Sequence, residues 1–137
     1  MTSIVIFPCR YPKIFCHAYE LSGLGSISPV PIKEAYTGLE DIVPALRCSL
    51  NKIIDVCPDE VHIITSGGTT KIGNIAILIG NLSEKFGLNV KYLWAARPET
   101  SKEYKITYLP PIKSEFSDEL LIAMEGGTLT VQMKGAN

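Results

Sequence analysis

Residues 61–76 read VHIITSGGTTKIGNIA, and this stretch decides the fold. A run of mainly apolar residues, typical of a buried strand, leads into a cluster of hydroxyl side chains and glycines. Lys71 comes next, and apolar residues then recur from Ile72 onward at helical spacing. The stretch therefore predicts a strand that turns directly into a helix, with glycine, hydroxyl and lysine residues at the turn.

The segments on either side extend this pattern to a strand–helix–strand unit. The helix keeps an apolar stripe up to Gly87, a natural helix stop, and residues 90–94 predict a second strand. Such a unit implies parallel strands joined by a right-handed crossover. Before it, residues 39–54 carry apolar positions at helical spacing, with Pro44 in the first two turns, and residues 3–7 predict a buried first strand.

The remaining segments give weaker signals. Residues 9–38 contain prolines and glycines with little periodicity, which predicts a loop with at most one short helix. Residues 105–109 predict a strand. The C-terminal part fits a helix over residues 117–124 followed by a strand over 128–133, or alternatively a hairpin between residues 120–124 and that strand.

Length predicts a single domain, and the strand–helix–strand unit with its continuous apolar strands predicts an α/β fold built on a mainly parallel sheet. Its core is expected over residues 1–95, with a C-terminal extension over residues 96–137. The net charge of −1 provides no broad basic surface for a long nucleic acid. The sequence shows no signal-peptide pattern and no apolar run of membrane-spanning length, so we expect a cytoplasmic protein without a membrane partner.

Cysteines and histidines are few, and their spacings match no zinc site. The cysteines are Cys9, Cys16, Cys48 and Cys57. We expect them to be buried and reduced rather than joined in disulfides. His62 lies in a predicted strand and His17 in the loop after the first strand, and a structural role is expected for both. No metal or other cofactor is expected.

The turn after residue 65 has the chemistry of an anion site. In open parallel sheets, ligands bind beyond the carboxyl ends of the strands, where helix N-termini present unpaired backbone N–H groups. The glycine pair at 67–68 lets the backbone approach a ligand closely. Hydroxyls of Ser66, Thr69 and Thr70, together with the charge of Lys71, complete a set of groups that suits phosphate.

A purely structural turn is the alternative, in which the glycines allow a tight turn and Thr69 or Thr70 caps the helix. Common phosphate motifs do not decide between the two. A Walker A loop needs Ser or Thr after its lysine, whereas Ile72 follows Lys71. The glycines at 67, 68 and 73 do not match GxGxxG, and GxSxG is absent.

Residues 58–94, PDEVHIITSGGTTKIGNIAILIGNLSEKFGLNVKYLW, resemble the C-terminal half of CARF domains, the CRISPR-associated Rossmann-fold sensors. Those domains carry a strand, a (T/S)GGT-like turn with lysine, a small-residue helix and a strand ending in an aromatic residue. The preceding NKIIDVCPDEV is also similar, and the first strand matches by position. The resemblance implies a Rossmann-like three-layer fold with a mainly parallel central sheet.

The resemblance also implies a ligand, cyclic oligoadenylate and foremost cyclic tetra-adenylate, bound across a two-fold homodimer. The pocket would be lined by Ser66, Gly67, Gly68, Thr69, Thr70 and Lys71, and from the loop after the first strand by Arg10 and Lys13. Two departures from the family stand out. Thr70 separates Lys71 from the threonine that the basic residue usually follows, and residues 9–38 leave little room for the extra strand of many relatives.

A CARF-like domain without an effector resembles the ring nucleases, which cut cyclic tetra-adenylate and switch off type III CRISPR signalling. On that resemblance the ligand's own 2′-hydroxyl would attack the adjacent phosphate without a metal. Lys71 would stabilise the phosphoryl charge, and Ser66 or Thr69 would orient the hydroxyl. Two alternatives stay open: a sensor or sponge that binds without cutting, and a dimeric scaffold whose glycine turn is only structural.

Overall fold

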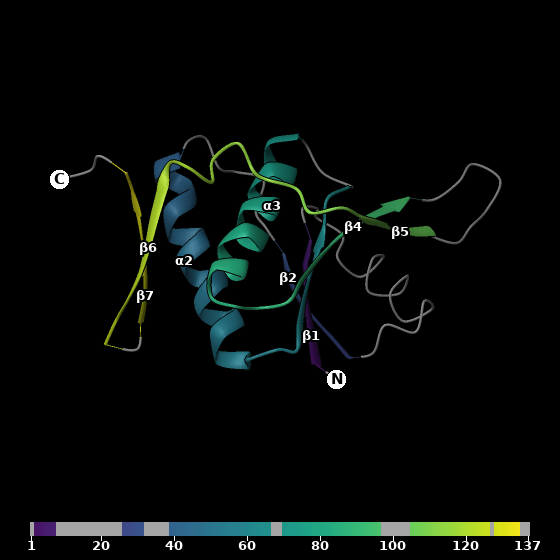
Figure 1. The fold of residues 1–137 in the computed structure, drawn as a ribbon, viewed down its shortest axis with the longest axis horizontal. Helices are drawn as coiled ribbons and strands as arrows, with labels where there is room; N and C mark the ends of the chain where they lie inside the picture. Colours follow the sequence, from purple (N-terminus) through teal and green to yellow (C-terminus); the bar gives the residue numbers. More distant parts are fainter. Residues whose placement is uncertain are drawn as a thin grey trace.

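The computed structural model describes residues 2–7, 26–31, 39–66, 70–96, 105–126 and 128–134. These residues form a five-stranded sheet, two helices and a two-stranded hairpin, which confirms an α/β fold (Figure 1). In chain order the elements are β1 (Thr2–Phe7), β2 (Ser26–Pro31), α2 (Leu39–Val56), β3 (Glu60–Ile64), α3 (Thr70–Lys85), β4 (Val90–Ala96), β5 (Lys105–Leu109), β6 (Leu120–Glu125) and β7 (Thr128–Met133).

The five-stranded sheet has the order β2-β1-β3-β4-β5. β1 lies between β2 and β3 and is parallel to both, and β3 is parallel to β4. β5 runs antiparallel to β4, with Tyr92 opposite Leu109 and Ala96 opposite Lys105. The sheet is therefore mixed, and its parallel part contains the predicted unit β3–α3–β4.

β2 corrects the prediction that residues 9–38 form a loop with at most one short helix. It pairs with β1 along its whole length, from Ser26 opposite Thr2 to Pro31 opposite Phe7. Pro29 and Pro31 argued against a strand here, because proline has no backbone N–H to donate to a neighbouring strand. The two prolines are two residues apart, so their missing donors lie on one side, and an edge strand has one side that needs no sheet partner. The segment between β1 and α2, which the sequence suggested was too short for a further strand, therefore contains one.

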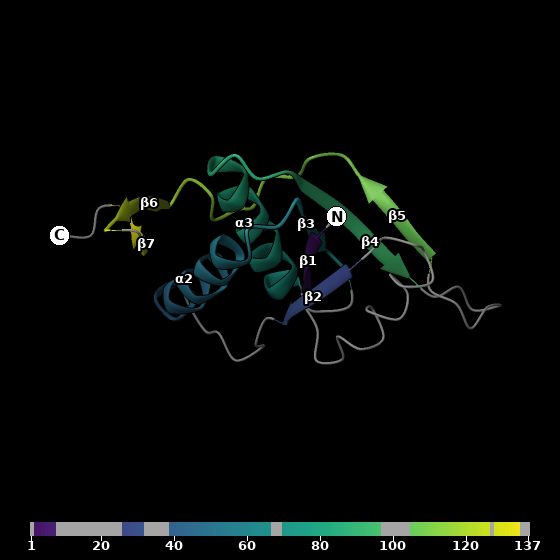
Figure 2. The same cartoon turned by 90° about the horizontal axis from the view of Figure 1, so that it is seen from below.

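α2 and α3 both lie on one face of the sheet (Figure 2). Buried residues of β1, β3 and β4 meet the apolar stripes of the two helices in one core, which includes Ile4, Ile6, Ile42, Leu46, Ile53, Val61, Ile63, Ile72, Ile75, Ile79, Leu82 and Tyr92. On the opposite face, Val5, Phe7, Ile64 and Leu93 are also fully buried. The parallel strands are thus buried on both faces, as their continuous apolar sequences predict.

Gly80 lets α3 approach the sheet closely. A Cβ at this position would lie 2.8 Å from Cγ1 of Ile63 and 3.0 Å from both Cε1 and the hydroxyl oxygen of Tyr92. Real Cβ atoms are almost never found at such distances, so a larger residue would displace the helix or the Tyr92 ring. The small residue therefore fixes the spacing between α3 and β3–β4.

Both long helices end in a residue with positive φ. After α2, Cys57 has φ 50° and its N–H donates to the Ile53 carbonyl at 3.0 Å. After α3, Gly87 has φ 80° and its N–H donates to the Glu84 carbonyl at 2.9 Å. The stop predicted at Gly87 is confirmed, while at Cys57 the same left-handed conformation is adopted by a residue with a Cβ.

The prediction of a helix over residues 117–124 is wrong, and the hairpin alternative is confirmed by β6 and β7. Leu120 is buried and Leu121 is 53% exposed, the period-two alternation of a strand. The two strands are joined by a two-residue turn in which Gly126 has φ 57°. β7 packs on α2, where the Leu129 N–H donates to Oδ1 of Asn51 at 3.2 Å.

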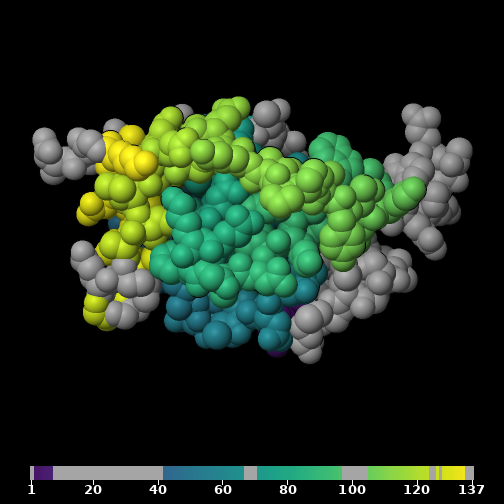
Figure 3. All heavy atoms as spheres, in the orientation of Figure 1, coloured from purple at the N-terminus to yellow at the C-terminus, as the bar shows by residue number. Residues whose placement is uncertain are grey.

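The strap, residues 110–119, connects β5 to β6 and lies across α3 (Figure 3). Two asparagines of α3 fasten it. Nδ2 of Asn81 donates to the Ile112 carbonyl at 2.8 Å, and Oδ1 of Asn81 accepts from the Ser114 N–H at 2.8 Å. The Ser114 hydroxyl donates to the Asn74 carbonyl at 3.0 Å. The C-terminal extension is therefore built into the core rather than appended to it.

Candidate functional site

Two hydroxyl side chains continue the β3–β4 ladder where β3 ends. The N–H and the Oγ1 hydroxyl of Thr65 both donate to the Leu93 carbonyl, each at 2.9 Å. Oγ of Ser66 accepts from the Ala95 N–H at 2.9 Å and donates to the Ala95 carbonyl at 2.7 Å. The chain consequently enters the predicted turn from a point that is fixed to the neighbouring strand β4.

α3 begins at Thr70, four residues after Ser66. Lys71, its second residue, is partly exposed, and the first turn contains no acidic residue. Gly73 is buried, and a Cβ there would lie 3.4 Å from the Thr65 carbonyl oxygen, so the first turn packs against the end of β3. The positive end of the helix dipole and the Lys71 charge therefore act together, which favours an anion at this helix terminus.

The ends of β1 and β3 lie side by side at the point where the strand order reverses. β2 lies on one side of β1 and β3 on the other, and the pair Ile6–Ile63 shows that the two strands end at the same level. In doubly wound sheets such a reversal opens a crevice beyond the carboxyl ends of the two strands, where ligands bind. The turn after β3 and the loop after β1 therefore start from neighbouring positions.

Three of the predicted site residues are in the described part of the chain: Ser66, Thr70 and Lys71. The backbone places them within six positions, between the end of β3 and the first turn of α3. The side chain of Thr70 lies outside the description, and so do five predicted residues, namely Gly67, Gly68, Thr69, Arg10 and Lys13. A pocket that joins all eight stays a prediction.

The structure gives Ser66 a role that the sequence did not reveal. Its side chain is buried, and both bonds of its hydroxyl go to the backbone of Ala95. Its proton is donated to the Ala95 carbonyl, so Ser66 could orient a ligand hydroxyl, as predicted, only by accepting from it through its remaining lone pair, on a side chain that is buried. A hydroxyl that follows a strand directly, next to a parallel neighbour, is the sequence signal for such ladder extension.

The described histidine and cysteines take no part in this site. His62 is buried in β3, with Nε2 2.7 Å from Oε2 of Glu60, in keeping with a structural role. Cys48 and Cys57 are free but exposed, so the expectation that the cysteines are buried is wrong for these two. They lie on or just after α2, whose buried positions are taken by aliphatic residues. His17, Cys9 and Cys16 lie outside the described residues.

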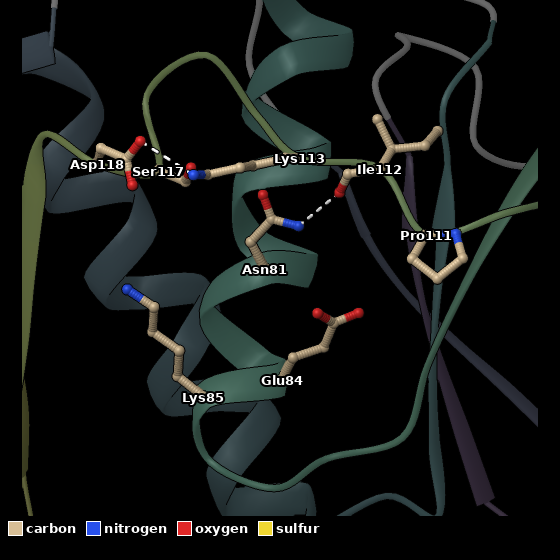
Figure 4. Close-up of a pocket in the computed structure, with 8 residues that line it drawn as sticks. All are labelled: Asn81, Glu84, Lys85, Pro111, Ile112, Lys113, Ser117 and Asp118. Carbon is tan, nitrogen blue, oxygen red and sulfur yellow. Dashed lines mark hydrogen bonds and ion pairs between the residues drawn. The ribbon is translucent and has the colours of Figure 1, made fainter.

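A hollow of about 510 Å³ lies elsewhere, between the C-terminal half of α3 and the strap (Figure 4). It is lined by Asn81, Glu84, Lys85, Pro111, Ile112, Lys113, Ser117 and Asp118. Its four charged side chains are two lysines and two acids, and one pair, Lys113 and Asp118, is joined at 3.0 Å. This balanced lining carries no net charge that would favour an anion in the hollow.

Behind this hollow, Tyr92 belongs to a side-chain network. Its hydroxyl accepts from Nδ2 of Asn81 at 2.7 Å and donates to Oε1 of Glu84 at 3.1 Å. Burial raises the pKa of Tyr92 above its ordinary range, and the nearby Glu84 carboxylate raises it further. The network was not predicted from the sequence, although Asn81 is a polar residue on a mainly apolar helix.

In the described part of the chain, no helix has the length and apolar character needed to cross a membrane. Nor do the described residues bring together three or more His, Cys, Asp or Glu side chains that could bind a metal ion. Comparison of the chain with protein-family models, with curated proteins and with solved structures gives no match.

Proposed function

We propose that the turn at residues 66–71 binds a cyclic oligoadenylate, foremost cyclic tetra-adenylate, and that the protein is a ring nuclease. The observation that supports this best is that β1 and β3 end side by side at the same level, where α3 begins with a first turn that contains no acidic residue. The order β2-β1-β3-β4 is one that doubly wound, Rossmann-like sheets use. A CARF-like fold is part of the same proposal.

The reaction follows from the ligand's own groups. The 2′-hydroxyl attacks the adjacent phosphorus, the bond from phosphorus to the 5′-oxygen breaks, and the proton passes to the leaving 5′-oxygen. The products are a 2′,3′-cyclic phosphate and a 5′-hydroxyl. Lys71 stabilises charge on the phosphoryl oxygens, together with N–H groups at the start of α3. The protein otherwise contributes alignment of nucleophile and leaving group.

A ligand with two-fold symmetry suits a homodimer in which each subunit supplies one turn. Arg10 and Lys13, which follow β1, would then reach phosphates from the other side of the pocket. In the cell this activity would remove the second messenger of type III CRISPR immunity and end the response.

Binding without cleavage is the second candidate, and one observation favours it. The Ser66 side chain is buried and its proton is donated to the Ala95 carbonyl, which disfavours Ser66 as the group that orients the ligand's 2′-hydroxyl. A sensor or sponge needs only the anion site. A dimeric scaffold, in which the turn is structural, predicts no affinity for the ligand.

The test is incubation of the purified protein with labelled cyclic tetra-adenylate in EDTA, followed by chromatography. Lys71→Ala is the test variant. Lys85→Ala is its matched control, because it removes the same charge from the same helix at the opposite end. We expect conversion to linear di-adenylate with a cyclic phosphate end, lost in Lys71→Ala and kept in Lys85→Ala.

The other outcomes separate the candidates. Intact ligand retained by wild type and Lys85→Ala but not by Lys71→Ala would identify a sensor or sponge. If wild type neither retains nor converts the ligand, the turn has a structural role only, and the proposal of a CARF-like function is wrong. Light scattering that shows a monomer with and without ligand would exclude a site shared between two subunits.

A further inference from the structure

Trp94 is a large aromatic side chain that the fold leaves half exposed. It lies in β4 beside the buried residues Leu93 and Ala95, yet 49% of its surface is accessible. β4 is paired on both sides, with β3 and with β5, where Thr107 lies opposite Trp94. The backbone that carries the indole is therefore held rigidly, unlike that of a surface loop.

The position of Trp94 relates it directly to the turn. Its neighbour Ala95 binds the Ser66 hydroxyl through both backbone groups. Because Ile64 lies opposite Leu93, Trp94 is level with Thr65, the last residue before the predicted turn. Side chains alternate along a strand, so Trp94 shares the face of Tyr92, the face on which α3 lies.

We infer that Trp94 is a stacking platform for one adenine of the ligand whose phosphate is bound at the start of α3. This inference rests on the proposed function and adds the element that recognises a base. A rigid, exposed indole on the strand beside the proposed anion site would, together with that site, offer the two contacts that a nucleotide needs, one for the phosphate and one for the ring. The proposed charged residues supply the phosphate contact alone.

Tyr108 provides a matched control for this inference. It is 54% exposed, lies on the neighbouring strand β5 and pairs with Leu93. Because Leu93 points to the face opposite Trp94, Tyr108 is an equally exposed aromatic residue on the wrong face of the same sheet. If any exposed aromatic ring contributed equally to binding, Trp94→Ala and Tyr108→Ala should weaken the affinity for the ligand alike. If Trp94 is a stacking platform, only Trp94→Ala should weaken it.

The experiment uses the fact that Trp94 is the single tryptophan of the chain. Cyclic tetra-adenylate is titrated into the full-length protein while tryptophan emission is recorded, with excitation at the red edge where adenine does not absorb. Affinity is measured in parallel by filter binding of labelled ligand, for wild type, Trp94→Ala, Trp94→Phe and Tyr108→Ala. Circular dichroism and thermal unfolding of each variant verify that it is folded.

We expect saturable quenching in wild type and an affinity weakened about 5- to 150-fold in Trp94→Ala, the effect of removing one base-stacking aromatic. Trp94→Phe should retain most of the affinity, and Tyr108→Ala all of it. Ligand that binds wild type without quenching, and binds Trp94→Ala equally well, would overturn the role of Trp94 while sparing the proposed function. Absence of binding to wild type would overturn both.

Discussion

Both hydrogen bonds of the Ser66 hydroxyl go to the backbone of a single residue, Ala95. Oγ accepts from the Ala95 N–H at 2.9 Å and donates to the Ala95 carbonyl at 2.7 Å. In a parallel ladder these two groups would normally be bound by the backbone of the neighbouring strand. Here a side chain takes over that function, because the backbone leaves the sheet at this point. Ser66 is thus a buried connection between β3 and β4.

Replacing Ser66 by Ala should therefore lower the free energy of unfolding by about 1–3 kcal/mol, because the buried Ala95 N–H and carbonyl lose their partner. Urea denaturation measures this change. Thr65→Val is the control, since the Leu93 carbonyl keeps its bond from the Thr65 N–H, and it should cost less than about 1 kcal/mol. Equal effects of the two substitutions would contradict this account of the Ser66 hydroxyl.

Gly80→Ala should destabilise the protein although alanine is the better helix former. The new Cβ would meet Ile63 at 2.8 Å and Tyr92 at 3.0 Å, and overpacking of this kind costs about 1–3 kcal/mol. Helix propensity offsets about 1 kcal/mol of that cost. Thermal or urea unfolding should therefore show a net loss of stability of up to about 2 kcal/mol.

Gly73→Ala, seven positions earlier in α3, is the matched control for Gly80→Ala. Its Cβ would meet the Thr65 carbonyl oxygen at 3.4 Å, the upper edge of a tight contact. The propensity gain of about 1 kcal/mol should then dominate, so Gly73→Ala should be neutral or slightly stabilising. A Gly80→Ala protein as stable as Gly73→Ala would show that α3 can move away from the sheet freely.

Cys57→Gly should stabilise the protein. Cys57 adopts φ 50°, a left-handed conformation that costs a residue with a Cβ about 1–2 kcal/mol and glycine almost nothing. Part of this gain is lost to the greater freedom of glycine in the unfolded chain, which leaves about 0.5–1 kcal/mol. Cys48→Gly, at an exposed position inside α2, should instead be destabilising by a few tenths of a kcal/mol. Urea denaturation checks this prediction, since the free energy of unfolding should rise in Cys57→Gly and fall in Cys48→Gly.

An element of this fold could be predicted from the sequence where its pattern of apolar residues fits only one type of secondary structure. The stripe from Ile72 to Leu82 fits only a helix, and it was predicted correctly. Leu120, Leu121 and Ile122 fit a helix and a strand equally, and only the glycine pair after Glu125 favoured the hairpin. β2 was missed because its two prolines exclude a central strand, while the edge position that permits them is a property of the whole sheet.

The candidate site shows the same limit. The sequence identified the strand–turn–helix junction, since glycine, hydroxyl and lysine residues cluster there. It could not show that Ser66 is bound to Ala95, because that contact spans 29 positions and depends on the pairing of β3 with β4. The half-exposed position of Trp94 likewise depends on which strands flank β4 and on which face α3 lies.

Tyr92 makes stability depend on pH in the alkaline range. Burial and the Glu84 carboxylate raise the pKa of Tyr92 in the folded protein above the ordinary value of 10.0. Above pH 10 the unfolded chain therefore loses this proton while the folded protein keeps it. Because the folded state then binds more protons, stability falls as pH rises, with a slope approaching about 1.4 kcal/mol per pH unit for this one group. Below pH 10 the contribution is fully present.

Tyr92→Phe should reduce this alkaline slope while also lowering stability at neutral pH, because Asn81 and Glu84 lose their contacts with the hydroxyl. Urea denaturation between about pH 9 and 11 separates the two effects, since only the titration changes the slope. Tyr108→Phe is the control, because it removes the same oxygen from an exposed side chain on β5 that lies outside the network of Asn81, Tyr92 and Glu84. If Tyr92→Phe keeps the full alkaline slope, the proton responsible belongs to another group, and the network of Asn81, Tyr92 and Glu84 acts through packing and hydrogen bonding alone.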